Sequence, residues 1–342
     1  MKNLILFITL VVSSISYSQK HSVFGGNIEV TQIGSNQFIM SASVQIDSFN
    51  VSSMAINAFD NATDTFVKTF TISLDSSAII PLRYQTHVID SLYVNYLSDT
   101  FNLSNNPNGY YFVNNEFSKI KGLNNFENAN YIFTCQIPNP AILAGNTNPR
   151  FSNFHDSLHI IINEIRNLNF SCFDSDGDSL KYSFIQAYDA FFSIGTGSRP
   201  FNLISFRPAY NLLNLLGPAG IGSINTNNGF TSIKAIQFGK FTLAVRCEEF
   251  RNGIKIGEVV RDLQLIVTDC GGNSLPTLSG INGAADSLGT TGAYKTTACV
   301  GQQICFYIQG FDKEAVPSSP IQDLTINWNF GVNATFVVDY AV

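Results

Sequence analysis

Residues 170–184 have the sequence FSCFDSDGDSLKYSF, in which a short acidic turn separates two segments of strand-forming residues. Apolar residues alternate with polar ones on either side of the turn, and its centre consists of Asp, Ser and Gly. The alternation is typical of half-buried strands, and Asp, Ser and Gly are residues that tight turns prefer. The stretch therefore predicts a strand, an acidic turn and a second strand.

Short alternating segments of this kind recur along the chain. The clearest are bounded by Gly, Asn, Asp, Ser or Pro and lie at residues 27–31, 37–44, 65–72 and 131–137. No long segment keeps the 3.6-residue period of a helix, although residues 117–123 and 210–216 could each form a helical turn or two. We therefore expect an all-β fold made of antiparallel sheets.

The composition narrows the class of protein. Of 342 residues, 45% are hydrophobic and only 13% are charged, with 19 Lys and Arg against 25 Asp and Glu and a formal net charge of −6. A chain this apolar buries enough surface to offset its conformational entropy, which excludes a disordered protein. The acidic balance argues against an extended nucleic-acid surface, because such a surface needs clustered Lys and Arg.

Residues 1–18 have the features of a signal peptide. Lys2 supplies a positive charge, an apolar run covers residues 4–12, and the small residues Ser16 and Ser18 suit cleavage by signal peptidase. The apolar run is shorter than the roughly 20 residues of a membrane-spanning helix, so we expect no membrane span. We expect export through this signal peptide to the cell surface or the extracellular space.

Turn-rich stretches divide the mature chain into three parts. We expect an N-terminal β-sandwich domain at residues 19–147 and a second β-sandwich module at residues 148–271. Residues 272–342 begin with a linker rich in Gly, Ser and Thr. Residues 306–328 then repeat the strand–acidic turn–strand pattern with a longer loop. The later strands of this third module are missing, so we expect either that the chain is the N-terminal portion of a longer protein or that its last module is incomplete and poorly stable.

The acidic turn is the sharpest candidate for a metal site. Asp174, Asp176 and Asp178 stand at alternate positions around Gly177, so their oxygens can turn toward one point. Ca²⁺ accepts about 6–8 oxygen ligands at flexible angles, and Glu164, before the preceding strand, is a candidate fourth carboxylate. An EF-hand is excluded, because the Gly comes too early and no Glu stands at the twelfth position. The alternative is a solvated turn in which Asp and Gly serve only the backbone.

Six cysteines in an exported chain indicate disulfides. Alternation places Cys172 on an apolar strand face with Phe170, and Cys247 on another with Val245. If both faces look into one sandwich, a Cys172–Cys247 bridge joins its two sheets, as in immunoglobulin domains. The alternative is two buried free thiols. The pairing stays open for Cys135, Cys270, Cys299 and Cys305.

The chain lacks the sequence patterns of the common enzyme classes. It has no G-x-S-x-G elbow, no phosphate-binding loop and no dinucleotide fingerprint. His155 and His159 are four residues apart, but their segment reads as the approach to a strand rather than as a zinc-binding helix. The Asn-rich segment 102–130 could line a carbohydrate groove with its aromatic residues, or these could turn inward. They are Tyr110, Tyr111, Phe112 and Phe126. We expect no catalytic residues and no enzymatic activity.

Several stretches resemble large secreted proteins of Bacteroidetes-type bacteria, which are often labelled gliding-motility-associated or type IX-secreted surface proteins. Residues 24–28 (FGGNI) look like the start of their mature chains, and residues 172–182 (CFDSDGDSLKY) are similar to their A-T-D-P-D-G-D-x-L-x-Y segment. Residues 241–270 are similar to a stretch that contains V-E-E-Y-R-N-G and ends in R-R-D-F-Q-x-x-V-x-D-C. Residues 299–306 resemble the opening of a further module.

The resemblance implies tandem immunoglobulin- or cadherin-like β-sandwiches without enzymatic activity. It also implies an adhesion or scaffold role at the cell surface, with gliding motility as one setting and a surface protein or a glycan as partner. Acidic turns are common in cadherin-like repeats, so the resemblance adds weight to calcium at Asp174, Asp176 and Asp178. The sorting domain of the family is not found in residues 1–342, which leaves the secretion route open.

A second hypothesis comes from a different class of protein. The N-terminal sandwich would bind a polysaccharide, and a catalytic domain for its degradation would lie beyond residue 342. An enzyme contained within residues 1–342 ranks below both hypotheses, because no acid/base pair stands out among the carboxylates.

Overall fold

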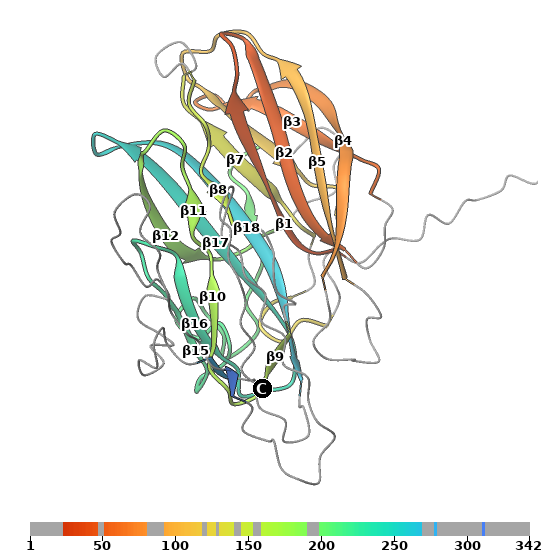
Figure 1. The fold of residues 1–342 in the computed structure, drawn as a ribbon, viewed down its shortest axis with the longest axis vertical. Coiled ribbons are helices and arrows are strands. Elements are labelled where there is room, and N and C mark those ends of the chain that lie inside the picture. Colours follow the sequence, from red (N-terminus) through yellow and green to blue (C-terminus); the bar gives the residue numbers. More distant parts are fainter. Residues whose placement is uncertain are drawn as a thin grey trace, which may run out of the picture.

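The described fold consists of β-strands and the turns between them (Figure 1). The computed structural model describes residues 23–46, 51–80, 92–117, 122–127, 130–139, 145–152, 159–189, 198–268, 277–278 and 310–311. These residues form no helix, so the expected all-β class is confirmed. Residues 210–216 form a series of turns in place of the helical turn. Accordingly, the described chain offers no helix of the length and apolarity needed to cross a membrane.

The first half of the described chain is an antiparallel sheet that curls around an apolar interior. Its strands follow the order β1 (Val23–Gln32), β2 (Gln37–Ile46), β5 (Leu92–Asn102), β4 (Phe66–Ile80), β3 (Ser53–Asp60), β6 (Tyr110–Asn114) and β7 (Phe133–Ile137). Strand β4 forms the bend of the sheet, because its first part pairs with β3 and its second part with β5. The strands expected at residues 37–44, 65–72 and 131–137 correspond to β2, β4 and β7.

Alternation along β2 fills the interior of this sheet. Its inward side chains are fully or almost fully buried, and most of those between them are partly exposed. The buried ones include Phe38, Met40, Ala42 and Val44. The Phe101 ring stacks on the rings of Phe38 and Phe70, with centroids 5.5 and 4.0 Å away. Burial of each large apolar side chain stabilises the fold by about 1.5–3 kcal/mol.

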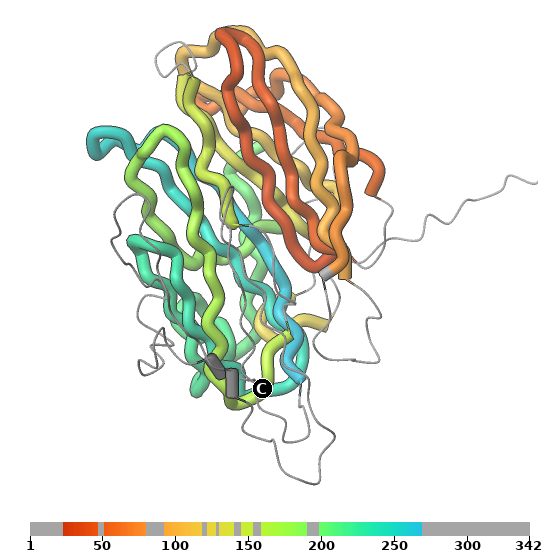
Figure 2. Tube along the Cα trace, in the orientation of Figure 1, coloured from red at the N-terminus to blue at the C-terminus, as the bar shows by residue number. Residues whose placement is uncertain are grey.

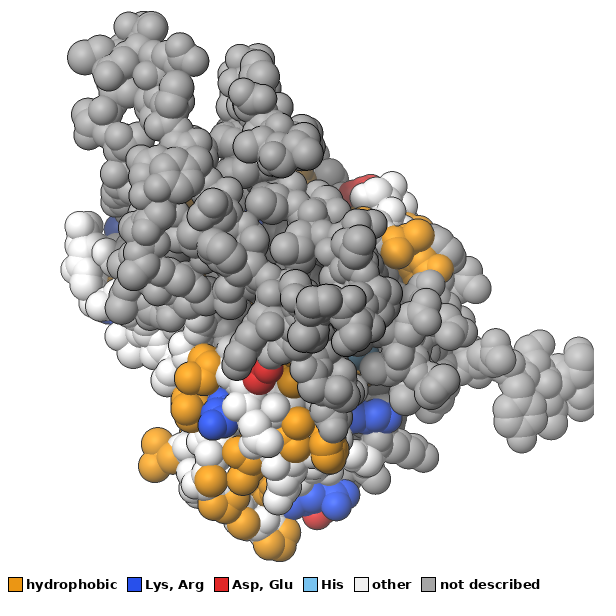
Figure 3. All heavy atoms as spheres, turned by 60° about the horizontal axis from the view of Figure 1, so that its bottom comes forward, with side chains coloured by type: hydrophobic (Ala, Val, Ile, Leu, Met, Phe, Trp, Pro, Cys, Tyr) orange, Lys and Arg blue, Asp and Glu red, His pale blue; other side chains and the backbone are white. Residues whose placement is uncertain are grey.

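The second half contains one long hairpin and several shorter pairings. In the hairpin, β17 (Gly239–Arg251) pairs with β18 (Ile254–Thr268), and β12 (Ser179–Ile185) adds to β17. A smaller sheet has the order β10 (Arg166–Asn169), β16 (Phe230–Lys234) and β15 (Ile221–Ile224). The remaining pairs are β8 (Arg150–Phe151) with β11 (Cys172–Phe173) and β13 (Tyr188–Asp189) with β14 (Asn202–Leu203). The lower end of this half, turned forward in Figure 3, carries exposed hydrophobic side chains.

Strand β18 joins the two halves (Figure 2). One edge of β18 pairs with β17 along most of its length. The other edge pairs in turn with β7, with β1 and, in parallel, with β9 (His159–Ile161). The two outer strands of the first sheet, β1 and β7, therefore both attach to one strand of the second half.

Of two adjacent glycines in β1, Gly25 allows the close approach to β18 and Gly26 leaves room for a ring of β7. Gly25 pairs with Leu263, and Gly26 pairs with Asp262. A Cβ atom on Gly25 would lie 2.6 Å from the Asp262 carbonyl oxygen, and one on Gly26 would lie 2.8 Å from the Phe133 ring. Any larger residue would push the strands apart. The FGGNI stretch is therefore where β1 of the first half pairs with β18 of the second, and we call this pairing the crossing.

Strand β1 is buried on both faces, unlike the half-buried strand that its alternation predicts. The reason is that the second half covers its polar face. Arg261 Nε donates to Asn27 Oδ1 over 2.9 Å, and Arg150 Nε donates to Glu29 Oε1 over 2.8 Å. Burial raises the pKa of Glu29 to about 7, although the charges of Arg150 and Arg261 act in the opposite direction.

The predicted modules 19–147 and 148–271 thus share strand pairings. The largest group of buried apolar side chains also draws on both, among them Phe133 and Leu263. The module boundaries themselves remain a prediction. Residues 1–18 lie outside the described residues. Of residues 272–342, the structure describes only β19 (Thr277–Leu278) and its antiparallel partner β20 (Gly310–Phe311).

Candidate functional site

The acidic turn is organised by the Asp174 side chain. Asp174 Oδ1 accepts hydrogen bonds from the backbone N–H groups of Asp176, over 2.9 Å, and Asp178, over 3.1 Å. Gly177 has a φ of 78°, in the left-handed region that favours glycine. These features fix the turn between β11 and β12, so the side chains of Asp176 and Asp178 leave it in defined directions.

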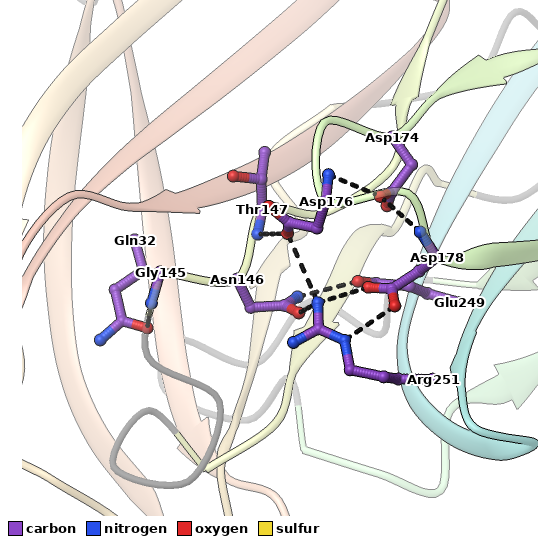
Figure 4. A network of polar contacts seen from close by, with 9 residues as sticks. All are labelled: Gln32, Gly145, Asn146, Thr147, Asp174, Asp176, Asp178, Glu249 and Arg251. Atoms are coloured by element: carbon purple, nitrogen blue, oxygen red, sulfur yellow. Dashed lines mark hydrogen bonds and ion pairs between the residues drawn. The ribbon is translucent and has the colours of Figure 1, made fainter.

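Asp178 binds Arg251, which lies at the end of β17 (Figure 4). Arg251 Nε donates to Asp178 Oδ1 over 2.8 Å, and Nη2 donates to Asp178 Oδ2 over 2.6 Å. The Asp178 side chain is only 5% exposed. The hydrogen bonds from Arg251 hold the pKa of Asp178 below its usual range. Bidentate pairs of this kind combine strong hydrogen bonds with a fixed geometry.

The same network reaches the connecting segment between the two halves, residues 145–149, which leads into β8. Asp176 Oδ2 accepts a hydrogen bond from Thr147 N over 2.7 Å, and Arg251 Nη2 donates to Asn146 Oδ1 over 2.9 Å. Asn146 in turn accepts, at its carbonyl oxygen, a hydrogen bond from Gln32 N of β1 over 3.1 Å. The acidic turn therefore ties the connecting segment to β17 on one side and to β1 on the other.

Glu249 is the most deeply buried carboxylate of this region. It lies on β17 with no exposed surface, and its Oε1 accepts a hydrogen bond from Asn146 Nδ2 over 2.9 Å. No donor in the described part of the chain reaches its other oxygen, Oε2. Burial, together with the neighbouring Asp178 and Asp174, raises the pKa of Glu249 to about 8. Gly257 makes room for Oε2, because a Cβ atom there would lie 2.5 Å from it.

Asp174, Asp178 and Glu249 form a compact carboxylate group. One oxygen from each lies within 4.8 Å of the other two. Asp174 Oδ2, like Glu249 Oε2, is buried and receives no hydrogen bond from the described residues. When all three carboxylates are ionised, Arg251, which is bound to Asp178, can neutralise only one of the charges. Because uncompensated buried carboxylates are costly, the group favours a bound proton or a cation, and oxygen ligands of this kind suit Ca²⁺.

The structure brings together only part of the ligand set predicted from the sequence. Asp174 and Asp178 belong to the carboxylate group. Asp176 lies outside it and bonds to the connecting segment. Glu164 lies in the turn between β9 and β10, whereas the acidic turn follows β11, beyond the other end of β10.

Glu249 was missed because it is distant in the sequence from the acidic turn. One signal for it was nevertheless present. Val245, Cys247 and Glu249 stand at alternate positions of β17, and all three are buried. A carboxylate on an otherwise apolar, buried strand face needs a hydrogen-bond donor or a cation to offset the cost of burying its charge. Such a position therefore indicates a polar or metal-binding site nearby.

The side chains of Cys172 and Cys247 lie in contact. Burial, together with the Cys247 thiol, raises the pKa of the Cys172 thiol well above its usual range. The Tyr182 hydroxyl accepts a hydrogen bond from Cys172 N over 2.8 Å. Both cysteines are free thiols in the structure, as is the buried Cys135, and the Cys172–Cys247 bridge remains a prediction. The other cysteines lie outside the described residues: Cys270, Cys299 and Cys305.

The aromatic residues considered for a carbohydrate groove are buried. Each exposes 3% or less of its surface: Tyr110, Tyr111, Phe112 and Phe126. These side chains therefore turn inward, and they offer no stacking platform for a sugar ring. His159 is buried in β9, and His155 lies outside the described residues.

Comparison with known proteins identifies no family. No protein-family model matches the chain, and no curated protein matches it. Among solved structures, a pair of tandem immunoglobulin domains of titin matches over 72% of this chain and 99% of that one, with 9% sequence identity and a TM-score of 0.19. This similarity is too low to establish a shared topology, so the fold rests on its own strand pairings.

Replacing Arg251 should weaken the fold much more than replacing a cation at the surface. Arg251→Met leaves the buried Asp178 without its donors, which should lower the free energy of unfolding by about 2–3 kcal/mol. Lys255→Met is the matched control. Lys255 contacts Glu248 at 2.7 Å and Glu258 at 2.6 Å, and loss of these outer contacts should cost less than about 1 kcal/mol. Urea unfolding followed by circular dichroism measures both, and equal losses would contradict the role given to Arg251.

Proposed function

We propose that this protein is an exported, non-enzymatic scaffold of the cell surface that holds binding loops on a stiff β-rich body. The observation that carries the proposal is strand β18, which pairs with strands of both halves. Bending between the halves would break these backbone hydrogen bonds and expose the buried polar face of β1. Stiffness of this kind suits a protein whose role is to hold contact surfaces in place, since binding residues are often loops on a rigid scaffold.

A second contact, made by Arg199 of the second half, supports the same proposal. Arg199 Nε donates to Asp64 Oδ1 over 3.2 Å, and Arg199 N donates to the Tyr111 hydroxyl over 3.0 Å. The Arg199 guanidinium lies 4.1 Å from the centre of the Tyr111 ring. Polar side chains thus serve to hold the halves together here, as they do at the acidic turn.

The proposed location and partner rest on the sequence. Residues 1–18 have signal-peptide features, and residues 172–182 and 241–270 resemble secreted surface proteins. On this basis the role is adhesion, gliding motility is one setting for it, and the partner is another surface protein or a glycan. The loops between strands would make the contact.

Protease treatment of intact cells tests the surface location. In cells that produce the protein, protease added from outside should remove it while a cytoplasmic marker protein stays intact. Deletion of its gene should reduce attachment of the cells to a surface. A protein that is cleaved only after the cells are lysed would contradict the proposal.

Calcium is the proposed ligand of the carboxylate group formed by Asp174, Asp178 and Glu249. Two of these residues have buried oxygens that receive no hydrogen bond from the described chain, which fits a hard cation. Bound calcium would supply the positive charge that Arg251 alone does not. It would thereby strengthen the link between the acidic turn, β17 and the connection between the halves.

Calcium should therefore raise the melting temperature. Saturating Ca²⁺, compared with EDTA, should shift Tm upward by roughly 5 °C, because a ligand that binds only the folded state stabilises it. Glu249→Gln should abolish the shift. Asp176→Asn, the matched control outside the carboxylate group, should keep it. Differential scanning calorimetry measures all three proteins, and an unchanged Tm of the natural protein, or an equal shift in Glu249→Gln, would rule out this site.

A further inference from the structure

Four apolar side chains are exposed at the end of the molecule where β18 stops. Leu213 is 88% exposed, Ile165 59%, Phe238 55% and Leu212 40%, and we call these four residues the end patch. Figure 3 shows hydrophobic side chains gathered on this end beside Lys and Arg side chains. Single exposed apolar residues are common on protein surfaces, whereas a group of them marks a contact site.

Two hydrogen bonds hold the loops of the end patch together. Tyr210 Oη donates to Gln237 Oε1 over 2.8 Å, which joins the loop with the two leucines to the loop with the phenylalanine. Asn163 N donates to Ala235 O over 2.8 Å, which joins the turn with the isoleucine to the same loop. The three loops that carry the end patch are therefore hydrogen-bonded to one another and do not move as independent loop tips.

The chain leaves the described body beside the end patch. Strand β18 ends at Thr268, whose carbonyl oxygen accepts a hydrogen bond from Ile162 N over 3.0 Å, at the start of the turn with the patch isoleucine. The preceding residue, Val267, pairs with Gly239, which directly follows Phe238. The residues after Thr268 thus begin between two members of the end patch, so they reach it at a high effective concentration.

Charge also favours binding of the residues that follow β18 to the end patch. The charged residues in or beside the loops of the end patch are mainly basic, namely Arg166, Arg207, Lys234 and Lys240 against Glu164 and against Glu127, which pairs with Arg207 at 4.0 Å. Residues 299–342 contain one basic and four acidic residues, for a formal net charge of −3. Opposite charges on two surfaces favour their association and fix their orientation.

We propose that the end patch docks the predicted third module of this chain, residues 299–342, and so fixes its orientation relative to the first two. The inference rests on the proposed multi-module scaffold. Thr277 pairs with Phe311, so the chain beyond β18 already returns on itself at β19 and β20. Within residues 324–330, Leu, Ile, Trp and Phe alternate with Thr and Asn, which predicts a strand with one apolar face.

Photo-crosslinking of the full chain tests this docking. One variant carries p-benzoylphenylalanine in place of Leu213, whose exposure should make the change harmless to folding. The control carries the same group in place of Phe173, which is 71% exposed and lies next to the acidic turn. After irradiation, mass spectrometry should find crosslinks within one molecule from position 213 to residues 299–342, and none from position 173. Adding Phe238→Ser should reduce the yield of these crosslinks.

Two results would overturn the docking proposal. Covalent dimers linked through position 213 would show that a second copy occupies the end patch. Crosslinks from position 213 that never reach residues 299–342 would show that the third module lies elsewhere. Both leave the proposed surface function standing, because protease treatment of intact cells measures that separately. Equally, a protein that is not exposed on cells would leave the crosslinking result unchanged.

Discussion

The close approach of β1 to β18 is the constraint on which the rest of the structure depends. Gly25 allows it, because a side chain there would meet the Asp262 backbone of β18, while Gly26 leaves room for the Phe133 ring of β7. Through this crossing, the curled sheet of the first half attaches to the hairpin of the second. The polar face of β1 is then covered, which explains why a strand with an alternating sequence is buried on both faces.

Burial of polar groups at the crossing has a cost that specific partners offset. Glu29 meets Arg150 on one side of the crossing, and Asp178 meets Arg251 near the acidic turn. No ion pair with Glu249 is found among the described residues, and burial together with the neighbouring carboxylates raises its pKa to about 8. Burying ion pairs adds little net stability, but breaking one is costly, so such pairs can favour one arrangement of the halves over others. A fixed arrangement is what the proposed surface scaffold would require.

Sequence patterns predicted the local structure well and the distant contacts poorly. Alternation located β2, β7 and the strands around the acidic turn. Successive residues of a strand point to opposite faces, so a buried and an exposed face appear as a local alternation of apolar and polar residues. It did not reveal that β18 pairs on one edge with β7, β1 and β9, since the period of a strand says nothing about which strand lies beside it. Glu249 was missed for the same reason. Asp174 and Asp178 were found because their geometry is set by a local turn.

Native-state hydrogen exchange at increasing urea concentrations tests most directly whether the two halves form one body. If β18 joins them, the most protected amides of β2 in the first half and of β12 in the second should reach the same free energy of opening. They should also show the same dependence on urea, since neither half would open without the other. Two different free energies, with one half opening while the other stays protected, would contradict the account.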